Sequence, residues 1–235
     1  MPSFREDFDS LDVSDWGCLS RWIAHTPWAG DFGDSTFMAP GERSPFAISD
    51  GILSIGVRRV SDDKWESGML SSWSRCNGGF AQKYGYFEIR TKLPSGPGFW
   101  PAFWLIGVDR SEGTAEVDIF EYYPHRPDKL EFGLHKHSSG PGDEHVTLGM
   151  HHNVEPGTLS EDFHTYGAEL TKDEVIFYLD REEVWRTPAP RQFRQPVYIL
   201  VSLATQKYRI NGDTPDSATM EIDYIHAYQR KPIGL

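Results

Sequence analysis

The chain has 235 residues, 14% aromatic side chains and a formal net charge of −12. Such an acidic composition leaves no basic excess to neutralise phosphates, which argues against nucleic acid and anionic membranes as partners. No apolar run reaches the roughly 18 residues that span a bilayer. The length suits one domain, which we take as residues 1–235.

Short runs of alternating apolar and polar residues predict β-strands along the chain. This period of two appears at residues 53–57, 87–93 and 130–135. Residues 180–181, between two apolar runs, predict a hairpin turn. Residues 197–203 form an almost continuous apolar run, as in a buried strand. With no long amphipathic helix in the pattern, we expect an all-β sandwich.

The run 115–123 places three carboxylates in a predicted strand. Because side chains alternate along a strand, Glu116 and Asp118 share one face, and the apolar residues between and after them face the core. Glu121 breaks this period and would point toward the core. One extra residue, a β-bulge at 119–120, would return Glu121 to the acidic face, and bulges are common beside active sites.

Three neighbouring carboxylates take different protonation states, because like charges raise one pKa relative to another. Retaining glycoside hydrolysis needs this division: one carboxylate attacks the sugar, and a second, about 5 to 5.5 Å away, protonates the leaving oxygen. We assign Glu116 as nucleophile, Glu121 as acid/base, and Asp118 as the intervening residue that shares a proton with Glu116. The alternative is an acidic edge strand that only faces water.

Two segments upstream of the acidic run carry a resemblance to a known family. Residues 84–94 read YGYFEIRTKLP, and residues 98–107 contain WPAFW. Together with the acidic motif they resemble glycoside hydrolase family 16, the laminarinase and lichenase group. Further similarity downstream extends the match over nearly the whole chain. The resemblance implies a concanavalin A-like β-jelly roll of two antiparallel sheets, a concave cleft for a polysaccharide, and a retaining double displacement.

The resemblance also points to side chains on the polysaccharide cleft. It places Trp100 in the cleft, whereas Trp104 lies either in the cleft or in the core. His135 falls on the strand expected beside the catalytic one, and similar enzymes place a histidine there close to the acid/base. We therefore expect His135 to face the cleft.

A loop near the N-terminus is a further candidate for glycan contacts. The segment 28–34 is similar to that of bacterial exopolysaccharide glycanases, and it contains Asp31 and Asp34. These aspartates either contact the glycan or only close turns. Arg75 follows a strand where similar enzymes carry an arginine that hydrogen-bonds sugar hydroxyls, although a plain surface arginine is the alternative.

No cofactor is expected for catalysis, but many similar enzymes hold one structural calcium ion. The resemblance assigns Asp223 and Gly51 to such a site, and oxygen ligands suit this hard cation. The nine histidines do not complete a known zinc spacing. Cys18 and Cys76 either form a disulfide or remain thiols, and the sequence leaves both open.

The predicted function is endo-acting, retaining cleavage of a mixed-linkage β-1,3-1,4-glucan or a glucose-rich bacterial exopolysaccharide. A β-1,3-glucanase, a transglycosylase and a non-catalytic lectin-like module are the alternatives, but the last has no need of three carboxylates. Residues 1–8 lack the basic and apolar regions of a signal peptide. Because polymeric glycans lie outside the cell, we nevertheless expect a secreted protein, and a monomer.

Overall fold

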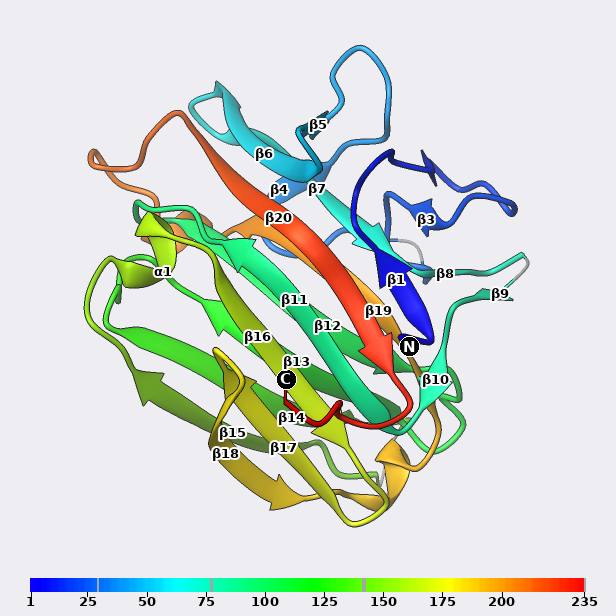
Figure 1. Cartoon of the computed structure of the whole chain (residues 1–235). Helices are drawn as coiled ribbons and strands as arrows, with labels where there is room; N and C mark the ends of the chain where they lie inside the picture. Colours follow the sequence, from blue (N-terminus) through cyan, green and yellow to red (C-terminus); the bar gives the residue numbers. More distant parts are fainter. Residues whose placement is uncertain (29, 77, 141–142, 235) are drawn as a thin grey trace.

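The computed structural model describes residues 1–28, 30–76, 78–140 and 143–234. Two layers of antiparallel strands are stacked face to face, which confirms the predicted all-β jelly roll (Figure 1). The described α-helix, α1, covers only Thr158–Glu161. Across the described ranges, no helix has the length and apolar character needed to cross a membrane.

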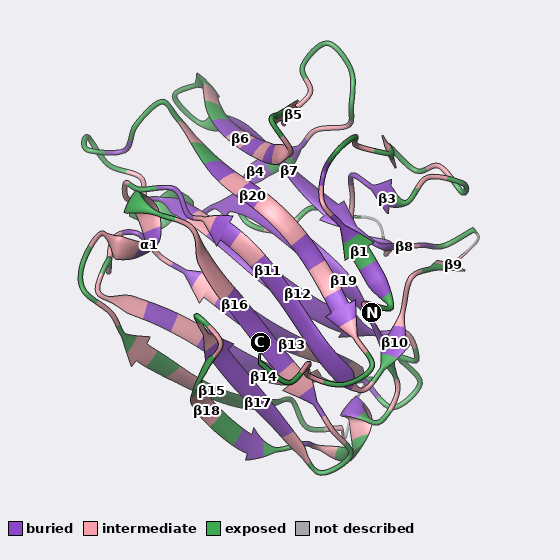
Figure 2. Cartoon of the chain, in the orientation of Figure 1, coloured by how far each residue is buried: buried purple, intermediate pink, exposed green. Residues whose placement is uncertain are grey.

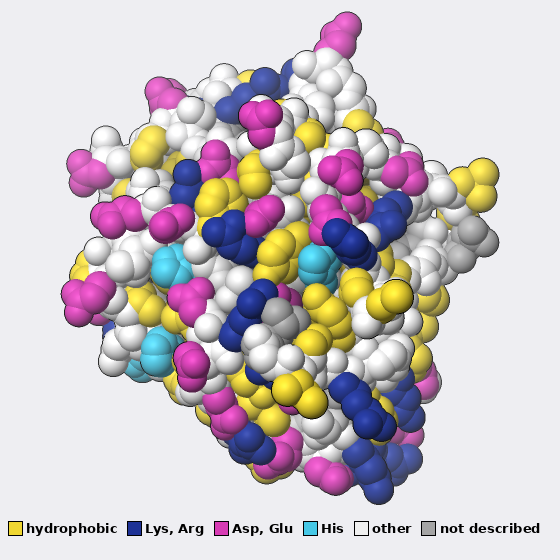
Figure 3. Space-filling model, in the orientation of Figure 1, with side chains coloured by type: hydrophobic (Ala, Val, Ile, Leu, Met, Phe, Trp, Pro, Cys, Tyr) yellow, Lys and Arg dark blue, Asp and Glu magenta, His cyan; other side chains and the backbone are white. Residues whose placement is uncertain are grey.

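The first layer, in front in Figure 1, is the outer sheet. Its strands run in the spatial order β5 (Phe46–Ser49), β6 (Ile52–Ser61), β20 (Ser217–Tyr228), β11 (Gly85–Lys92), β16 (His164–Leu170), β17 (Glu174–Leu179) and β18 (Glu182–Pro188). The short β1 (Phe4–Glu6) also pairs with β20. Acidic and basic side chains are both spread over the face seen in Figure 3, and several Lys and Arg side chains gather at its lower right.

The second layer is the inner sheet. Its main strands are β7 (Lys64–Ser71), β19 (Pro196–Thr205), β12 (Phe99–Gly107), β13 (Thr114–Tyr122), β14 (Lys129–His137) and β15 (Val146–Asn153). Shorter elements are β2 (Val13–Ser14), β3 (Trp22–Ile23), β4 (Ser35–Phe37), β10 (Gln82–Lys83), the β8–β9 hairpin (Trp73–Ser74, Gly78–Gly79), and the 3-10 turns Arg191–Phe193 and Lys207–Arg209. Because β7 pairs with both β6 and β19, it joins the two sheets along one edge.

The core lies between the sheets, where the apolar positions of both layers meet (Figure 2). The predicted alternation is confirmed in β6, where Leu53, Ile55 and Val57 are at most 1% exposed. The continuous apolar run of β19 is also confirmed, since its alternate residues pack on both faces. The inner sheet is therefore covered on one side by the outer sheet and leaves its other face for a site.

The predicted hairpin at 180–181 is confirmed, and both residues adopt left-handed φ values of 49° and 68°. Such values favour glycine, yet Arg181 occupies the second position. Its guanidinium donates two hydrogen bonds of 3.2 Å to Glu88, a fully buried residue that the alternation had assigned to the polar face. The hydroxyls of Tyr86 and Tyr224 donate to the same carboxylate at 2.8 and 2.7 Å. These charge-assisted bonds offset the backbone strain and satisfy the buried charge.

The predicted β-bulge in the acidic strand is confirmed. On the β12 side, Phe120 and Asp118 pair with consecutive residues, so Ile119 is the extra residue. On the β14 side, the register shifts between Asp118 and Glu121. Both Ile119 and Phe120 pack into the main core. Their burial returns Glu121 to the face that carries Glu116 and Asp118.

Cys18 and Cys76 form a disulfide, which settles the alternative left by the sequence. Their Cα atoms are 5.4 Å apart across a sequence separation of 58 residues. The bond ties the N-terminal segment to the β8–β9 hairpin, and both segments lie at one end of the inner sheet (Figure 1).

Candidate active site

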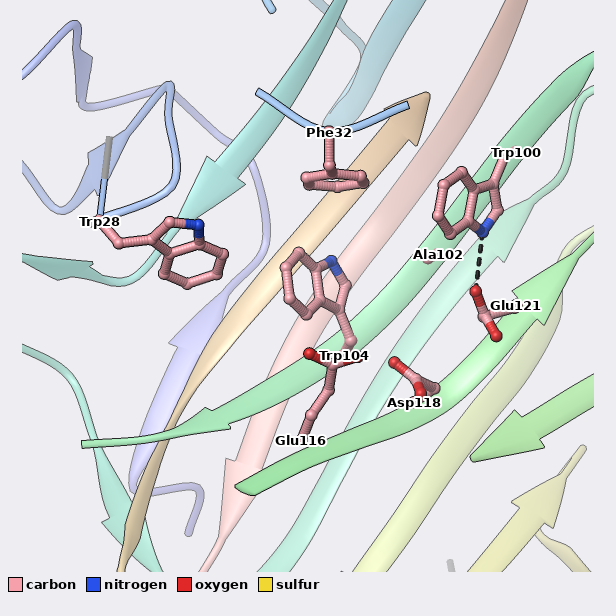
Figure 4. A pocket seen from close by; sticks show the side chains of 8 residues that line it. All are labelled: Trp28, Phe32, Trp100, Ala102, Trp104, Glu116, Asp118 and Glu121. Carbon is pink, nitrogen blue, oxygen red and sulfur yellow. Dashed lines mark hydrogen bonds between the residues drawn. The ribbon is translucent and has the colours of Figure 1, made fainter. Parts of the chain in front are cut away.

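A pocket of about 220 Å³ opens on the face of the inner sheet that points away from the core. Its walls come from β12, from β13 and from the loop that precedes β4. It is lined by three carboxylates and four aromatic side chains around a small floor residue: Glu116, Asp118, Glu121, Trp28, Phe32, Trp100, Trp104 and Ala102. Figure 4 shows the carboxylates on one side and the aromatic rings on the other.

Strand alternation explains how β12 contributes to this pocket. Trp100, Ala102 and Trp104 point into it, whereas Phe99 and Phe103 pack in the core between the sheets. In β13, alternation together with the bulge points Glu116, Asp118 and Glu121 into the same pocket. The sequence therefore positions an apolar floor and an acidic wall on neighbouring strands.

Glu121 is held by two hydrogen bonds to one oxygen. Trp100 Nε1 and the Tyr123 hydroxyl each donate to Glu121 Oε1 at 2.8 Å, and their rings stack with centroids 6.0 Å apart. Burial raises the pKa of Glu121, although these two hydrogen bonds act in the opposite direction because they favour the ionised carboxylate. The carboxyl is thereby oriented while its protonated form is favoured by its surroundings.

Asp118 lies between the two glutamates and is 5% exposed. Burial, followed by the charges of Glu116 and Glu121, raises the pKa of Asp118 well above its usual value. His135 Nε2 lies 3.0 Å from Asp118 Oδ2, close enough for an ion pair, but that oxygen has no hydrogen bond of acceptable geometry within the described part of the chain.

Glu116 is contacted by a second histidine. His137 Nε2 lies 3.1 Å from Glu116 Oε2, and the His137 ring stacks on that of His135 at 5.9 Å. Thr147 on β15 links this pair to His145, through bonds of 3.0 Å to His135 Nδ1 and 2.9 Å to His145 Nε2. A histidine cluster therefore borders the Glu116 and Asp118 side of the pocket.

The predicted cleft residues on β12 and β14 come together at this site. Trp100 contacts Glu121, and His135 reaches the acidic group through Asp118 rather than Glu121. Trp104 was expected either in the cleft or in the core. It is only 6% exposed, yet its ring forms part of the pocket wall, so it is both buried and part of the cleft.

The structure does not bring Asp31, Asp34 or Arg75 into this pocket. Asp31 Oδ2 accepts a hydrogen bond from the Phe37 amide at 3.2 Å, and Asp34 Oδ2 accepts one from the Lys207 amide at 2.6 Å. Both carboxylates thus hold the loop in place, and their contact with glycan stays a prediction. Arg75 lines an adjoining hollow.

Sequence reasoning missed four residues of the site. Trp28 and Phe32 lie in the same loop as the predicted Asp31 and Asp34. They line the pocket only because this loop folds over the inner sheet. Tyr123 lies just after the acidic strand, and its hydroxyl contact depends on how the chain leaves β13. His137 had a readable signal, since it lies two residues beyond His135 and therefore shares its face.

The residues of the site include one group that could hold a metal ion. Glu116, Asp118 and His135 offer ligand atoms within 4.8 Å of one another. The predicted calcium residues lie elsewhere: Asp223 accepts a hydrogen bond from Arg90 through Oδ2, and Gly51 lies in the β5–β6 turn close to a backbone carbonyl. The binding of calcium by Asp223 and Gly51 stays a prediction.

The sequence is similar to glycan-cleaving enzymes over nearly its whole length. The sequence model for "Glycosyl hydrolases family 16" matches residues 43–226. The Endo-1,3-1,4-beta-glycanase EglC of Rhizobium meliloti (strain 1021) is 30% identical, over 96% of this chain and 51% of its own length. The Glucan endo-1,3-beta-glucosidase A1 of Niallia circulans is 29% identical, over 97% of this chain and 38% of its own length. This chain thus spans about half the length of EglC and less of the second relative.

Solved structures agree with the fold. The catalytic domain of an endo-1,3-beta-glucanase (laminarinase) from Thermotoga petrophila RKU-1 superposes with a TM-score of 0.79 at 25% identity. The superposition covers 99% of this chain and 98% of that chain. The jelly roll therefore matches along its whole length.

Proposed function

The chain belongs to glycosyl hydrolase family 16, and on that premise we propose that it is a retaining, endo-acting β-glucanase. One observation carries the proposal: the bulge in β13 gathers Glu116, Asp118 and Glu121 on one pocket wall, and burial raises the pKa of Glu121. A lectin-like module would use the aromatic wall but would gain nothing from these costly, mutually repelling carboxylates.

The proposed reaction is a double displacement. The carboxylate of Glu116 attacks the anomeric carbon while protonated Glu121 gives its proton to the leaving oxygen. Water then attacks the glycosyl-enzyme, Glu121 takes up its proton, and the product leaves with the β configuration. A protonated Asp118 would donate a hydrogen bond to Glu116 before attack, and the contact of His137 with Glu116 would orient the same carboxylate.

The proposed substrate is a mixed-linkage β-1,3-1,4-glucan or a glucose-rich exopolysaccharide, in line with the names of the relatives. The aromatic residues Trp28, Phe32, Trp100 and Trp104 offer flat surfaces for the C–H faces of glucose rings. The pocket shares Trp28 with one neighbouring hollow and Glu121 with another. Such continuation on two sides suits binding within a chain instead of at its terminus.

Further parts of the proposal concern the molecule as a whole. We propose that residues 1–235 form one catalytic domain acting as a monomer outside the cell. The Cys18–Cys76 disulfide supports an oxidising compartment. We also propose a structural calcium ion at Asp223 and Gly51, with the Asp7 carbonyl nearby.

The test uses lichenan, barley β-glucan and laminarin, with reducing ends and viscosity followed together. We expect new reducing ends with a steep early fall in viscosity, as internal cleavage requires. The Glu116→Gln variant should release none, whereas the control Glu42→Gln, in an exposed loop, should match the native protein. Binding of every polymer without cleavage would reject the enzyme in favour of a lectin-like module.

A further inference from the structure

A second hollow, of about 210 Å³, adjoins the candidate active site. Trp28 lines both, so the two form one continuous surface. The second hollow is lined by two arginines and a mainly aromatic and apolar set: Arg75, Arg110, Pro27, Trp28, Trp73, Val108 and Tyr198. In Figure 4, Trp28 lies at the end of the pocket away from Trp100 and Glu121, so the hollow extends the site in that direction.

Strand register places this hollow beyond the Glu116 end of the pocket. Ile106 of β12 pairs with Glu116 on one side and with Tyr198 of β19 on the other. Arg110 lies shortly after β12, and its Nη2 donates a hydrogen bond of 2.9 Å to the Tyr198 hydroxyl. The hollow therefore lies where further sugar units of a bound chain would run.

Arg75 and Arg110 have no acidic partner among the residues that the structure describes. Within the described residues, no carboxylate lies within the 4.0 Å of an ion pair with either side chain. Arg110 rests on the Trp28 ring, with its guanidinium carbon 4.4 Å from the ring centroid. A guanidinium has five N–H donors, so most of those of Arg110 remain for a ligand. Its stacking on Trp28 keeps the fork in one orientation.

Two arginines also line another surface hollow, but there they share an acidic partner. Arg43 and Arg58 converge on one carboxylate, Glu66, with N–O distances of 2.6 and 2.7 Å. At the hollow beside the active site, two arginines again line one space, but no carboxylate is among its lining residues. What distinguishes Arg75 and Arg110 is their position, because the hollow that they line shares Trp28 with the candidate active site.

We propose that this hollow is a subsite for an anionic substituent of the glycan, a carboxylate carried by a sugar or by a group attached to it. Arg75 and Arg110 would bind the carboxylate, and Trp28 and Trp73 would cover the ring that bears it. The preferred substrate is then an acidic β-glucan or exopolysaccharide rather than a neutral one. This inference rests on the proposed function and narrows its substrate class.

The experiment compares barley β-glucan with the same polymer lightly oxidised at C6, which introduces carboxylates and leaves the linkages intact. The measured quantity is the ratio of kcat/KM on the oxidised polymer to that on the neutral polymer. We expect a ratio above one for the native protein, falling with added NaCl because salt screens charges that water reaches. In the Arg75→Gln/Arg110→Gln double variant the ratio should fall about tenfold, as expected when hydrogen bonds to a charged group are removed.

Arg186→Gln is the matched control, because it removes the same kind of charge from the outer sheet. It should leave the ratio as in the native protein, which separates a local subsite from overall charge. An unchanged ratio in the double variant would overturn the proposal, whether kcat/KM stays at the native value on both polymers or decreases equally on both.

A binding measurement keeps this test independent of the proposed function. In the Glu116→Gln background, calorimetry with oligosaccharides from both polymers reports affinity without cleavage. Tighter binding of the oxidised set, abolished in the double variant, supports the subsite even if no polymer is cut. Absence of cleavage by the native protein counts against the β-glucanase proposal alone, whereas equal affinities for both sets count against the subsite alone.

Discussion

Removal of the Tyr123 hydroxyl gives the sharpest test of how the site holds its acid. Glu121 Oε1 accepts two hydrogen bonds of 2.8 Å, from Tyr123 and from Trp100. Tyr123→Phe removes one of them and keeps the ring that stacks on Trp100. The variant therefore changes the orientation and titration of Glu121 with little change in packing.

The expected size of the effect follows from one hydrogen bond. A net contribution of about 1 kcal/mol corresponds to about a fivefold decrease in kcat/KM. If the two donors act independently, combining Tyr123→Phe with Trp100→Phe should lower kcat/KM by about thirtyfold. Any direct stacking of the indole on the sugar would add to that decrease.

The pH profile should move in a definite direction. The Tyr123 bond lowers the pKa of Glu121, because it favours the ionised carboxylate. Without the bond the pKa of Glu121 rises further, so the protonated acid persists to higher pH. The basic limb of kcat/KM on barley β-glucan should therefore shift upward, even as the plateau falls.

Tyr122→Phe serves as the control, because that side chain is 1% exposed and packs in the core between the sheets, away from the pocket. It should lower stability without shifting the basic limb. If Tyr123→Phe kept the native plateau and the native pH profile, the hydrogen bond to Glu121 would have no part in catalysis, and the reasoning would fail.

Three other predictions concern Asp118, the disulfide and calcium. Asp118→Asn should lower kcat by about 100-fold, because it removes the proton that we propose Asp118 shares with Glu116; an unchanged kcat measured from reducing ends would contradict that role. Cys18→Ser with Cys76→Ser should reduce the free energy of unfolding by about 4 kcal/mol, from the 58-residue separation that the disulfide closes; urea denaturation checks this, and equal midpoints would count against it. Calcium chloride should raise the Tm relative to EDTA, and Asp223→Asn should remove that rise; the same Tm in both buffers would reject the calcium site.

The bulge was predictable because side chains alternate between the two faces of a strand, so residues an odd number of positions apart lie on opposite faces. Glu121 lies an odd number of residues beyond Glu116, so a shared face requires one extra residue between them. The same logic gave the core face of β6 correctly. It failed at Glu88, because that carboxylate is covered by Tyr86 of the same strand and by Arg181 and Tyr224, which come from other parts of the outer sheet.

Other features depend on distances that the sequence does not contain. The Cys18–Cys76 bond needs two segments 58 residues apart to meet, and nothing local signals that meeting. Trp28 and Phe32 become pocket walls only because their loop folds back over the inner sheet. The proximity of Arg75 to Arg110 likewise arises from separate strand ends, so it has no signature in either segment.

The central claim is that Glu116 and Glu121 act together in a retaining reaction. NMR of the earliest product from barley β-glucan tests it directly, because the anomeric signal reports configuration before mutarotation. We predict that the β-anomer appears first, and that Glu116→Gln yields no product. Initial appearance of the α-anomer would contradict double displacement and the assignment of Glu116 as nucleophile.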